Sequence, residues 1–280
     1  MKRTILIPTD FSEVCNTAVE YGAKLARSVK ADIVLYHAVT SESERYMKQN
    51  GFSEKDLFTM MEKTSVIIFD EYAVHSDVKI TRNDLFGGIS QMCNLEDPFL
   101  IILGTHGKKG FQKISGGYVS KVLSLTGVPV LTVHKNTVFN DFKNLAFPVS
   151  LNFEDRQKFN MAVKLAGSFK SRVHVIPKYE GDRLRKSKIM NIVKQIKDYF
   201  SMTGLPVVDN VTDPKAGRYS SQILDYSAKN NIDMIFSVFD NDRVLNPDKF
   251  SDRLIYNKHF IPVLNVVAVK PKVFDWANSR

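Results

Sequence analysis

The chain has 280 residues, of which 44% are hydrophobic and 25% charged, as is typical of a globular protein with one large domain or two ordinary ones. No apolar run approaches the roughly 20 residues needed to span a bilayer, so we expect no membrane insertion. The first apolar run ends at Pro8, too soon for a signal peptide. The only cysteines are Cys15 and Cys93, without metal-ligand or redox spacing, which favours a cytoplasmic location.

The net charge of +9 is unevenly distributed. Residues 1–140 carry 16 Lys+Arg and 15 Asp+Glu, whereas residues 141–280 carry 23 and 15. Such an excess can attract nucleic acid or an acidic partner, but a solvated basic face explains it more simply. The basic run at 183–188 begins an amphipathic helical pattern with few aromatic residues nearby, so nucleic acid is not the expected partner.

The first part of the chain alternates predicted strands and helices. We expect strands over 3–8, 31–39 and 78–80, and a helix over 89–95. Ser12 is the expected N-cap of a first helix, whose inward face comprises Val14, Ala18, Tyr21, Leu25 and Val29. A polar insertion over 40–53 precedes a helix with Leu57, Met60, Met61 and Thr64 facing inward. This alternation predicts an α/β fold with a parallel sheet.

Residues 99–133 read as strand, glycine-rich loop, helix and strand. Phe99 to Leu103 is a short apolar run that leads into a loop with three glycines and two lysines, over 104–110. A helical stretch then opens at 115–117, and residues 128–133 form a second strand. Glycines let backbone N–H groups approach an anion closely, so this loop is a candidate phosphate site. A βα turn that needs glycine only for its conformation is the plainer alternative.

The spacing Gly104-x2-Gly107-x9-Gly117 resembles the nucleotide-binding motif of the universal stress protein family. The segments 5–12 and 128–130 are similar to that family as well. In the family the last glycine is normally followed by Ser or Thr, whereas this chain has Tyr118. Ser120 stands where the family often has another hydroxyl.

The same pattern recurs about 140 residues later. Residues 145–148 repeat 5–8, and 164–170 repeat the 24–30 spacing of Lys, Leu-Ala, Ser and Lys. The sequence therefore predicts a duplication, with domains over 1–138 and 143–272 and a linker near 136–142. By the resemblance, each is a Rossmann-like (HUP-type) domain with a five-stranded, mainly parallel sheet flanked by helices. The resemblance also implies an intramolecular pseudo-dimer in which strands 128–133 and 262–267 meet; a homodimer of the chain stays open.

The second copy lacks the residues that would hold phosphate. Ser150 replaces Asp10, residues 237–240 contain no glycine, and Phe250 stands in place of Gly117. Two acids, Asp240 and Asp242, lie where phosphate would need donors, which is electrostatically unfavourable. We therefore expect a degenerate second domain that binds no nucleotide in the usual way.

The resemblance implies a stress-response regulatory protein that binds ATP or a related adenine nucleotide, with or without magnesium, in its first domain. The positions that match the family's site are Pro8, Thr9, Asp10, Phe11, Val39, Gly104, Gly107, Gly117, Tyr118, Val119 and Ser120. Asp10 suits a ribose hydroxyl or a metal-bound water, or simply the positive end of the first helix.

Two alternatives stay open. In one, Tyr118 closes the site and the protein is a module that binds still unidentified proteins. In the other, the protein hydrolyses ATP slowly. No general base is evident for that reaction, so we expect that the protein is not an enzyme.

Overall fold

The computed structural model describes residues 3–105, 116–151, 159–209, 217–239 and 249–267. The strands are β1 (Thr4–Pro8), β2 (Asp32–Val39), β3 (Ser76–Arg82), β4 (Leu100–Gly104), β5 (Val130–Val133), β6 (Asn144–Val149), β7 (Arg172–Pro177), β8 (Val207–Asp209), β9 (Met234–Phe239) and β10 (Val263–Val267). The helices are α1 (Glu13–Val29), α2 (Ser41–Asn50), α3 (Glu54–Tyr72), α4 (Leu85–Glu96), α5 (Gly116–Thr126), α6 (Phe159–Phe169), α7 (Arg183–Met202), α8 (Tyr219–Lys229) and α9 (Lys249–Ile255).

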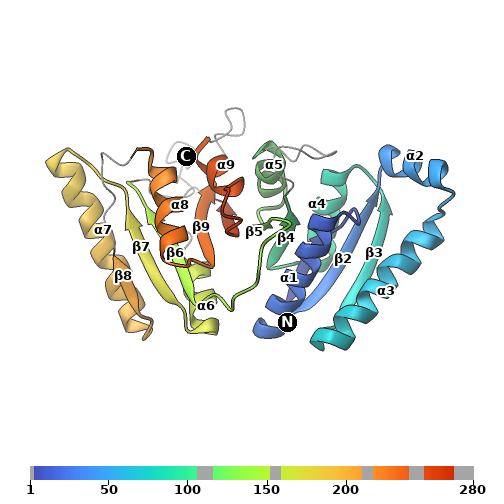
Figure 1. Cartoon of the computed structure of the whole chain (residues 1–280), viewed down its shortest axis with the longest axis horizontal. Helices are drawn as coiled ribbons and strands as arrows, with labels where there is room; N and C mark the ends of the chain where they lie inside the picture. The colour runs from blue at the N-terminus through green and yellow to red at the C-terminus, as the bar shows by residue number, and fades with distance from the viewer. Residues whose placement is uncertain (1–2, 106–115, 152–158, 210–216, 240–248, 268–280) are drawn as a thin grey trace, which may run out of the picture.

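The ten strands form one sheet in the order β3-β2-β1-β4-β5-β10-β9-β6-β7-β8. The two halves repeat the same strand order, and every pairing within a half is parallel. Helices cover both faces of the sheet (Figure 1). The prediction of two tandem Rossmann-like units with five-stranded, mainly parallel sheets is confirmed.

The two halves join at the antiparallel pair β5–β10, with Leu131 opposite Leu264. Two buried side chains bond across this seam. Thr132 Oγ1 donates to the Val263 carbonyl at 3.1 Å, and Asn265 Nδ2 donates to the Val130 carbonyl at 3.4 Å. The pseudo-dimer implied by the family resemblance is therefore present within the chain, in a single continuous sheet.

The linker between the halves is part of the core. Phe142 is fully buried, and its ring lies 4.9 Å from that of Phe169 and 5.3 Å from that of Phe139, each pair edge to face. Phe139 in turn contacts Tyr21 of α1 at 5.1 Å. Aromatic contacts of this kind add about 0.5–1.5 kcal/mol each beyond the burial of area. The linker thus ties α1 to α6.

Hydrophobic periodicity predicted the inward face of α1 correctly, since all five residues named for it are buried. Ser12 is its N-cap as expected, but without a side-chain cap hydrogen bond. The prediction for α3 was partly wrong, because Met60 is 39% exposed. The polar insertion at 40–53 contains α2, which begins at the Thr40 cap and ends at Gly51 in a left-handed conformation. Within the described ranges, no helix combines the length and apolar character needed to cross a membrane.

Candidate functional site

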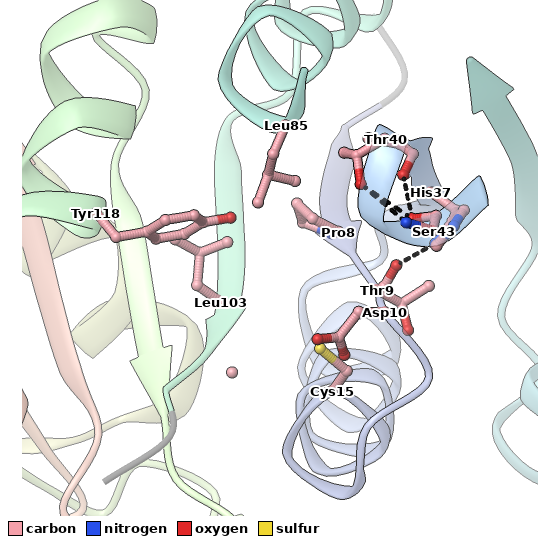
Figure 2. Close-up of a pocket in the computed structure, with 12 residues that line it drawn as sticks. Pro8, Thr9, Asp10, Cys15, His37, Thr40, Ser43, Leu85, Leu103 and Tyr118 are labelled. Carbon is pink, nitrogen blue, oxygen red and sulfur yellow. Dashed lines mark hydrogen bonds between the residues drawn. The ribbon is translucent and has the colours of Figure 1, made fainter. Parts of the chain in front are cut away.

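A hollow lies at the carboxyl ends of β1, β2 and β4, where parallel α/β sheets usually bind ligands. Its lining residues are Pro8, Thr9, Asp10, Cys15, His37, Ala38, Thr40, Ser43, Leu85, Leu103, Gly104 and Tyr118 (Figure 2). The cavity has a volume of about 50 Å³. That is small beside the roughly 300–1,000 Å³ of typical ligand sites.

The loop between β1 and α1 is held by its own side chains. Thr9 Oγ1 accepts from the Phe11 N–H at 3.1 Å, and Asp10 Oδ1 accepts from the Ser12 N–H at 3.0 Å. Phe11 has φ +64°, an uncommon conformation for a bulky residue that costs about 1–3 kcal/mol. This turn places the Asp10 carboxylate at the hollow, near the start of α1, where a negative charge is stabilised.

Tyr118 reaches into the hollow from the first turn of α5. Figure 2 shows its ring beside Leu103, pointing toward Leu85 and Pro8. The ring also contacts that of Phe86 with centroids 5.1 Å apart, and Lys121 Nζ lies 3.9 Å from the centre of the Phe86 ring. Burial, followed by electrostatic interaction with Cys15 and Asp10, raises the pKa of the Tyr118 hydroxyl, so it is a neutral donor at physiological pH.

Gly104 has a packing role that is sufficient to explain its presence. A Cβ atom at this position would lie 2.8 Å from the carbonyl oxygen of Val14 in α1, and backbone atoms cannot easily move aside. Glycine here allows β4 and α1 to approach closely. This observation favours the plainer interpretation of the glycine, and it is compatible with a ligand.

The sequence missed His37 and Cys15, which both line the hollow. His37 Nδ1 lies 2.8 Å from the Thr9 carbonyl oxygen, which can only accept, so Nδ1 carries the proton. Burial lowers the pKa of His37, and the neutral ring therefore leaves Nε2 as an acceptor. Nε2 is buried and has no hydrogen-bond partner among the described residues. Burial and the neighbouring Asp10 raise the pKa of the Cys15 thiol to about 12, so it is not a reactive thiolate.

The positions predicted from the family resemblance divide into three groups. Pro8, Thr9, Asp10, Gly104 and Tyr118 line the hollow. Phe11, Val39, Gly117, Val119 and Ser120 are described but are not among its lining residues; Val119 is fully buried in the core, and Val39 packs with Met47 and Leu57. Gly107 lies outside the described residues, as do Lys108 and Lys109.

The corresponding place in the second half has a different arrangement of hydrogen bonds. In the first half the Thr9 N–H donates directly to the Tyr36 carbonyl at 2.8 Å. The equivalent atoms in the second half are the Val149 N–H and the Ile176 carbonyl, and the Tyr219 hydroxyl sits between them. It accepts from the former at 2.9 Å and donates to the latter at 2.6 Å.

Phe250, which replaces the last motif glycine, covers this arrangement. Its ring stacks on that of Tyr219 with centroids 5.6 Å apart and an interplanar angle of 14°. Tyr219 begins α8, as Leu85 begins the equivalent α4, so an aromatic ring takes the place of an aliphatic side chain. Two stacked rings thus stand at positions that Leu85 and Gly117 hold in the first half.

Comparisons with known proteins agree with this architecture. The family model of the universal stress protein family matches residues 1–134. The crystal structure of a universal stress protein from Archaeoglobus fulgidus DSM 4304 superposes with a TM-score of 0.76 at 17% identity, covering 95% of this chain and 98% of that chain. The cytoplasmic domain of a prokaryotic cation chloride cotransporter has the same fold, with a TM-score of 0.58, 11% identity and 96% of both chains covered.

A universal stress protein family protein from Arabidopsis thaliana, solved with AMP bound, matches with 21% identity. The match covers 48% of this chain and 92% of the Arabidopsis chain, with a TM-score of 0.36. Another universal stress protein was solved in complex with cAMP. No curated protein matches the chain. The family match identifies residues 1–134 as a universal stress protein domain, and the duplicated sheet gives the second half the same strand order.

Proposed function

We propose that this chain is a cytoplasmic stress-response regulator that binds one adenine nucleotide in the hollow of its first domain, over 1–138. The second domain, over 143–272, serves as scaffold. The observation that supports this best is the difference between the halves: the first has a hollow lined by polar groups, and in the second the rings of Tyr219 and Phe250 stack at the corresponding positions.

His37 offers a means of recognising the base. Its bare Nε2 acceptor is buried at the hollow and lacks a partner among the described residues, which is costly unless a ligand donates to it. The exocyclic amine of adenine is such a donor, whereas the equivalent oxygen of hypoxanthine is not. The proposal therefore predicts that ATP binds more tightly than ITP, and that His37→Phe removes most of this preference.

The sugar and phosphates would extend toward Asp10 and the start of α5. Asp10 would accept from a ribose hydroxyl, and the phosphates would meet backbone N–H groups near Gly104, Gly107 and Gly117. In this proposal magnesium enters with the triphosphate rather than at a site built from the chain's own side chains. The role is regulatory: binding shifts the protein toward the conformation that holds nucleotide more tightly.

Tyr118 must rotate outward for this ligand to enter, because the cavity of about 50 Å³ cannot hold a nucleoside. The same observation favours a second candidate function, a module that binds partner proteins with its hollow permanently closed. The two are separated by Tyr118→Ser, which removes the ring and supplies the hydroxyl residue that the family normally has here.

Titration calorimetry with ATP and magnesium tests both. We expect at most one nucleotide per chain for the wild type, tighter binding for Tyr118→Ser, and weaker binding for Asp10→Asn. Tyr118→Phe is the matched control, since it keeps the ring. Binding by Tyr118→Ser alone would favour the closed module; no binding by either protein, or two sites per chain, would refute the proposal.

A further inference from the structure

Exposed apolar side chains are concentrated at the two ends of the sheet. Sixteen large apolar side chains are exposed among the described residues. Six lie at 52–69, on or beside α3, and five lie on α7 and β8. Single exposed apolar residues are normal on a protein surface, but a concentration of this kind marks an interaction surface.

The outward stripe of α3 is formed by Phe58, Val66 and Phe69, which we call the α3 face. These residues are spaced by eight and three, so they lie along one side of the helix. Val66 is 58% exposed and Phe69 61% exposed, whereas Leu57, Met61 and Ile68 of the opposite side are buried. The helix contains five acids and two bases, a net charge of −3.

The counterpart on α7 has the opposite sign. Leu184 is 73% exposed and Met202 86% exposed, and since 18 residues make five full turns they point in the same direction. With Tyr199, about 60° around the helix from them, they form what we call the α7 face, in which exposed Lys188, Asn191 and Gln195 lie between Leu184 and Met202. The helix contains six bases against one acid, a net charge of +5.

These two faces lie at opposite ends of the molecule (Figure 1). α3 packs on β3 and α7 packs on β7 and β8, and β3 and β8 are the outermost strands of the sheet. The helices are also nearly equal in length, at 19 and 20 residues, or about 28 and 30 Å.

We propose that the α3 face of one copy of this chain docks on the α7 face of the next copy, so that the protein assembles head to tail. The occupant is a second copy because this chain itself carries, at its other end, a helix of opposite charge and similar length with exposed apolar side chains near both of its ends. A symmetric α3–α3 contact would oppose acid to acid, and an α7–α7 contact would oppose base to base. Because the two faces lie at opposite ends, a docked pair keeps one free face of each kind and can add further copies.

We expect the contact between the α3 face and the α7 face to be weak, because its buried area is small. A pair of helices of this length covers less than the roughly 800 Å² per partner of a stable interface. Assembly therefore depends on protein concentration, and it weakens as salt screens the opposite charges.

Sedimentation equilibrium of the full chain tests the proposal. At about 20 mM NaCl we expect the average mass to rise above 31.8 kDa with concentration and to exceed that of a dimer, and at about 500 mM NaCl to return toward 31.8 kDa. Val66→Ser/Phe69→Ser blocks the α3 face, and Leu184→Ser/Met202→Ser blocks the α7 face. Each should lower the association constant at least about tenfold, the equivalent of about 1.4 kcal/mol. Leu95→Ser, at a position that is 67% exposed on α4, is the matched control and should assemble like the wild type.

Mixing the two blocked variants gives the sharpest result. Each retains one working face, so an equimolar mixture should form a dimer and stop there. Three results would each overturn the proposal. They are a wild type that stays monomeric at low salt, a dimer that forms equally well with the α7 substitutions, and a mixture of the two variants that stays monomeric. Circular dichroism of the variants verifies that they are folded.

Discussion

Tyr219→Phe removes the hydroxyl that sits between β6 and β7 and leaves the rest of the side chain in place. Two backbone groups lose a partner: the Val149 N–H, at 2.9 Å, and the Ile176 carbonyl, at 2.6 Å. The Val149 carbonyl, also near this hydroxyl at 3.2 Å, keeps the Lys178 N–H as a donor. Leaving a buried group without its partner costs about 1–3 kcal/mol. Partial closure of the two strands would recover some of this, as in the direct Thr9–Tyr36 bond of the first half.

We therefore expect Tyr219→Phe to destabilise the protein by about 1–3 kcal/mol. For a chain of this size each kcal/mol lowers the thermal midpoint by about 2–4 °C. Differential scanning calorimetry provides the measurement. Tyr179→Phe, at a position that is 40% exposed, is the control and should stay within about 0.5 kcal/mol of the wild type. If both variants melt like the wild type, the hydroxyl does not hold the ends of these strands and the reasoning about Tyr219 is wrong.

Three further predictions concern packing, titration and the seam. Gly104→Ala should destabilise the protein by about 1–3 kcal/mol in thermal unfolding, because its Cβ would meet the Val14 carbonyl; an unchanged midpoint would show that α1 can move aside. Burial lowers the pKa of His37, His134 and His174, so the unfolded chain takes up protons first as pH falls below about 6.5. The urea midpoint should therefore be lower at about pH 5.5 than at about pH 7.5, and an increase would contradict this sign. Thr132→Val removes the bond to the Val263 carbonyl across the seam and should cost about 1 kcal/mol by denaturant unfolding, whereas a neutral result would mean that this side-chain bond adds nothing to the stability of the seam.

Periodicity and duplication predicted most of the fold, because buried positions recur with the period of the element that buries them. The five inward residues of α1 follow from this. α2 was missed because it is polar almost throughout and depends on its ends, the Thr40 cap and the left-handed Gly51. Met60 was misjudged because α3 has apolar residues on its exposed side too, and spacing alone cannot tell the two sides apart.

The candidate site was predictable only where the backbone forms it. Pro8 and Gly104 end strands, Thr9 and Asp10 follow one, and the carboxyl ends of parallel strands meet at one edge. His37 lies within a strand, where alternation gives no sign that its ring reaches the hollow. The bonds of Tyr219 to β6 and β7 join residues 43 and 70 positions apart, and no local pattern reveals them. Gly107 and its neighbouring lysines stay predictions.

The pairing of β5 with β10 has an evolutionary consequence. In a dimer of two identical chains, every substitution appears twice, so a phenylalanine in place of the last motif glycine would obstruct both halves together. Here the antiparallel seam joins two halves that are encoded separately, and each can change without the other. Because both halves lie in one chain, a substitution in one half is not repeated in the other. The second half could therefore lose its motif glycines and still supply β10, which pairs with β5 of the first half.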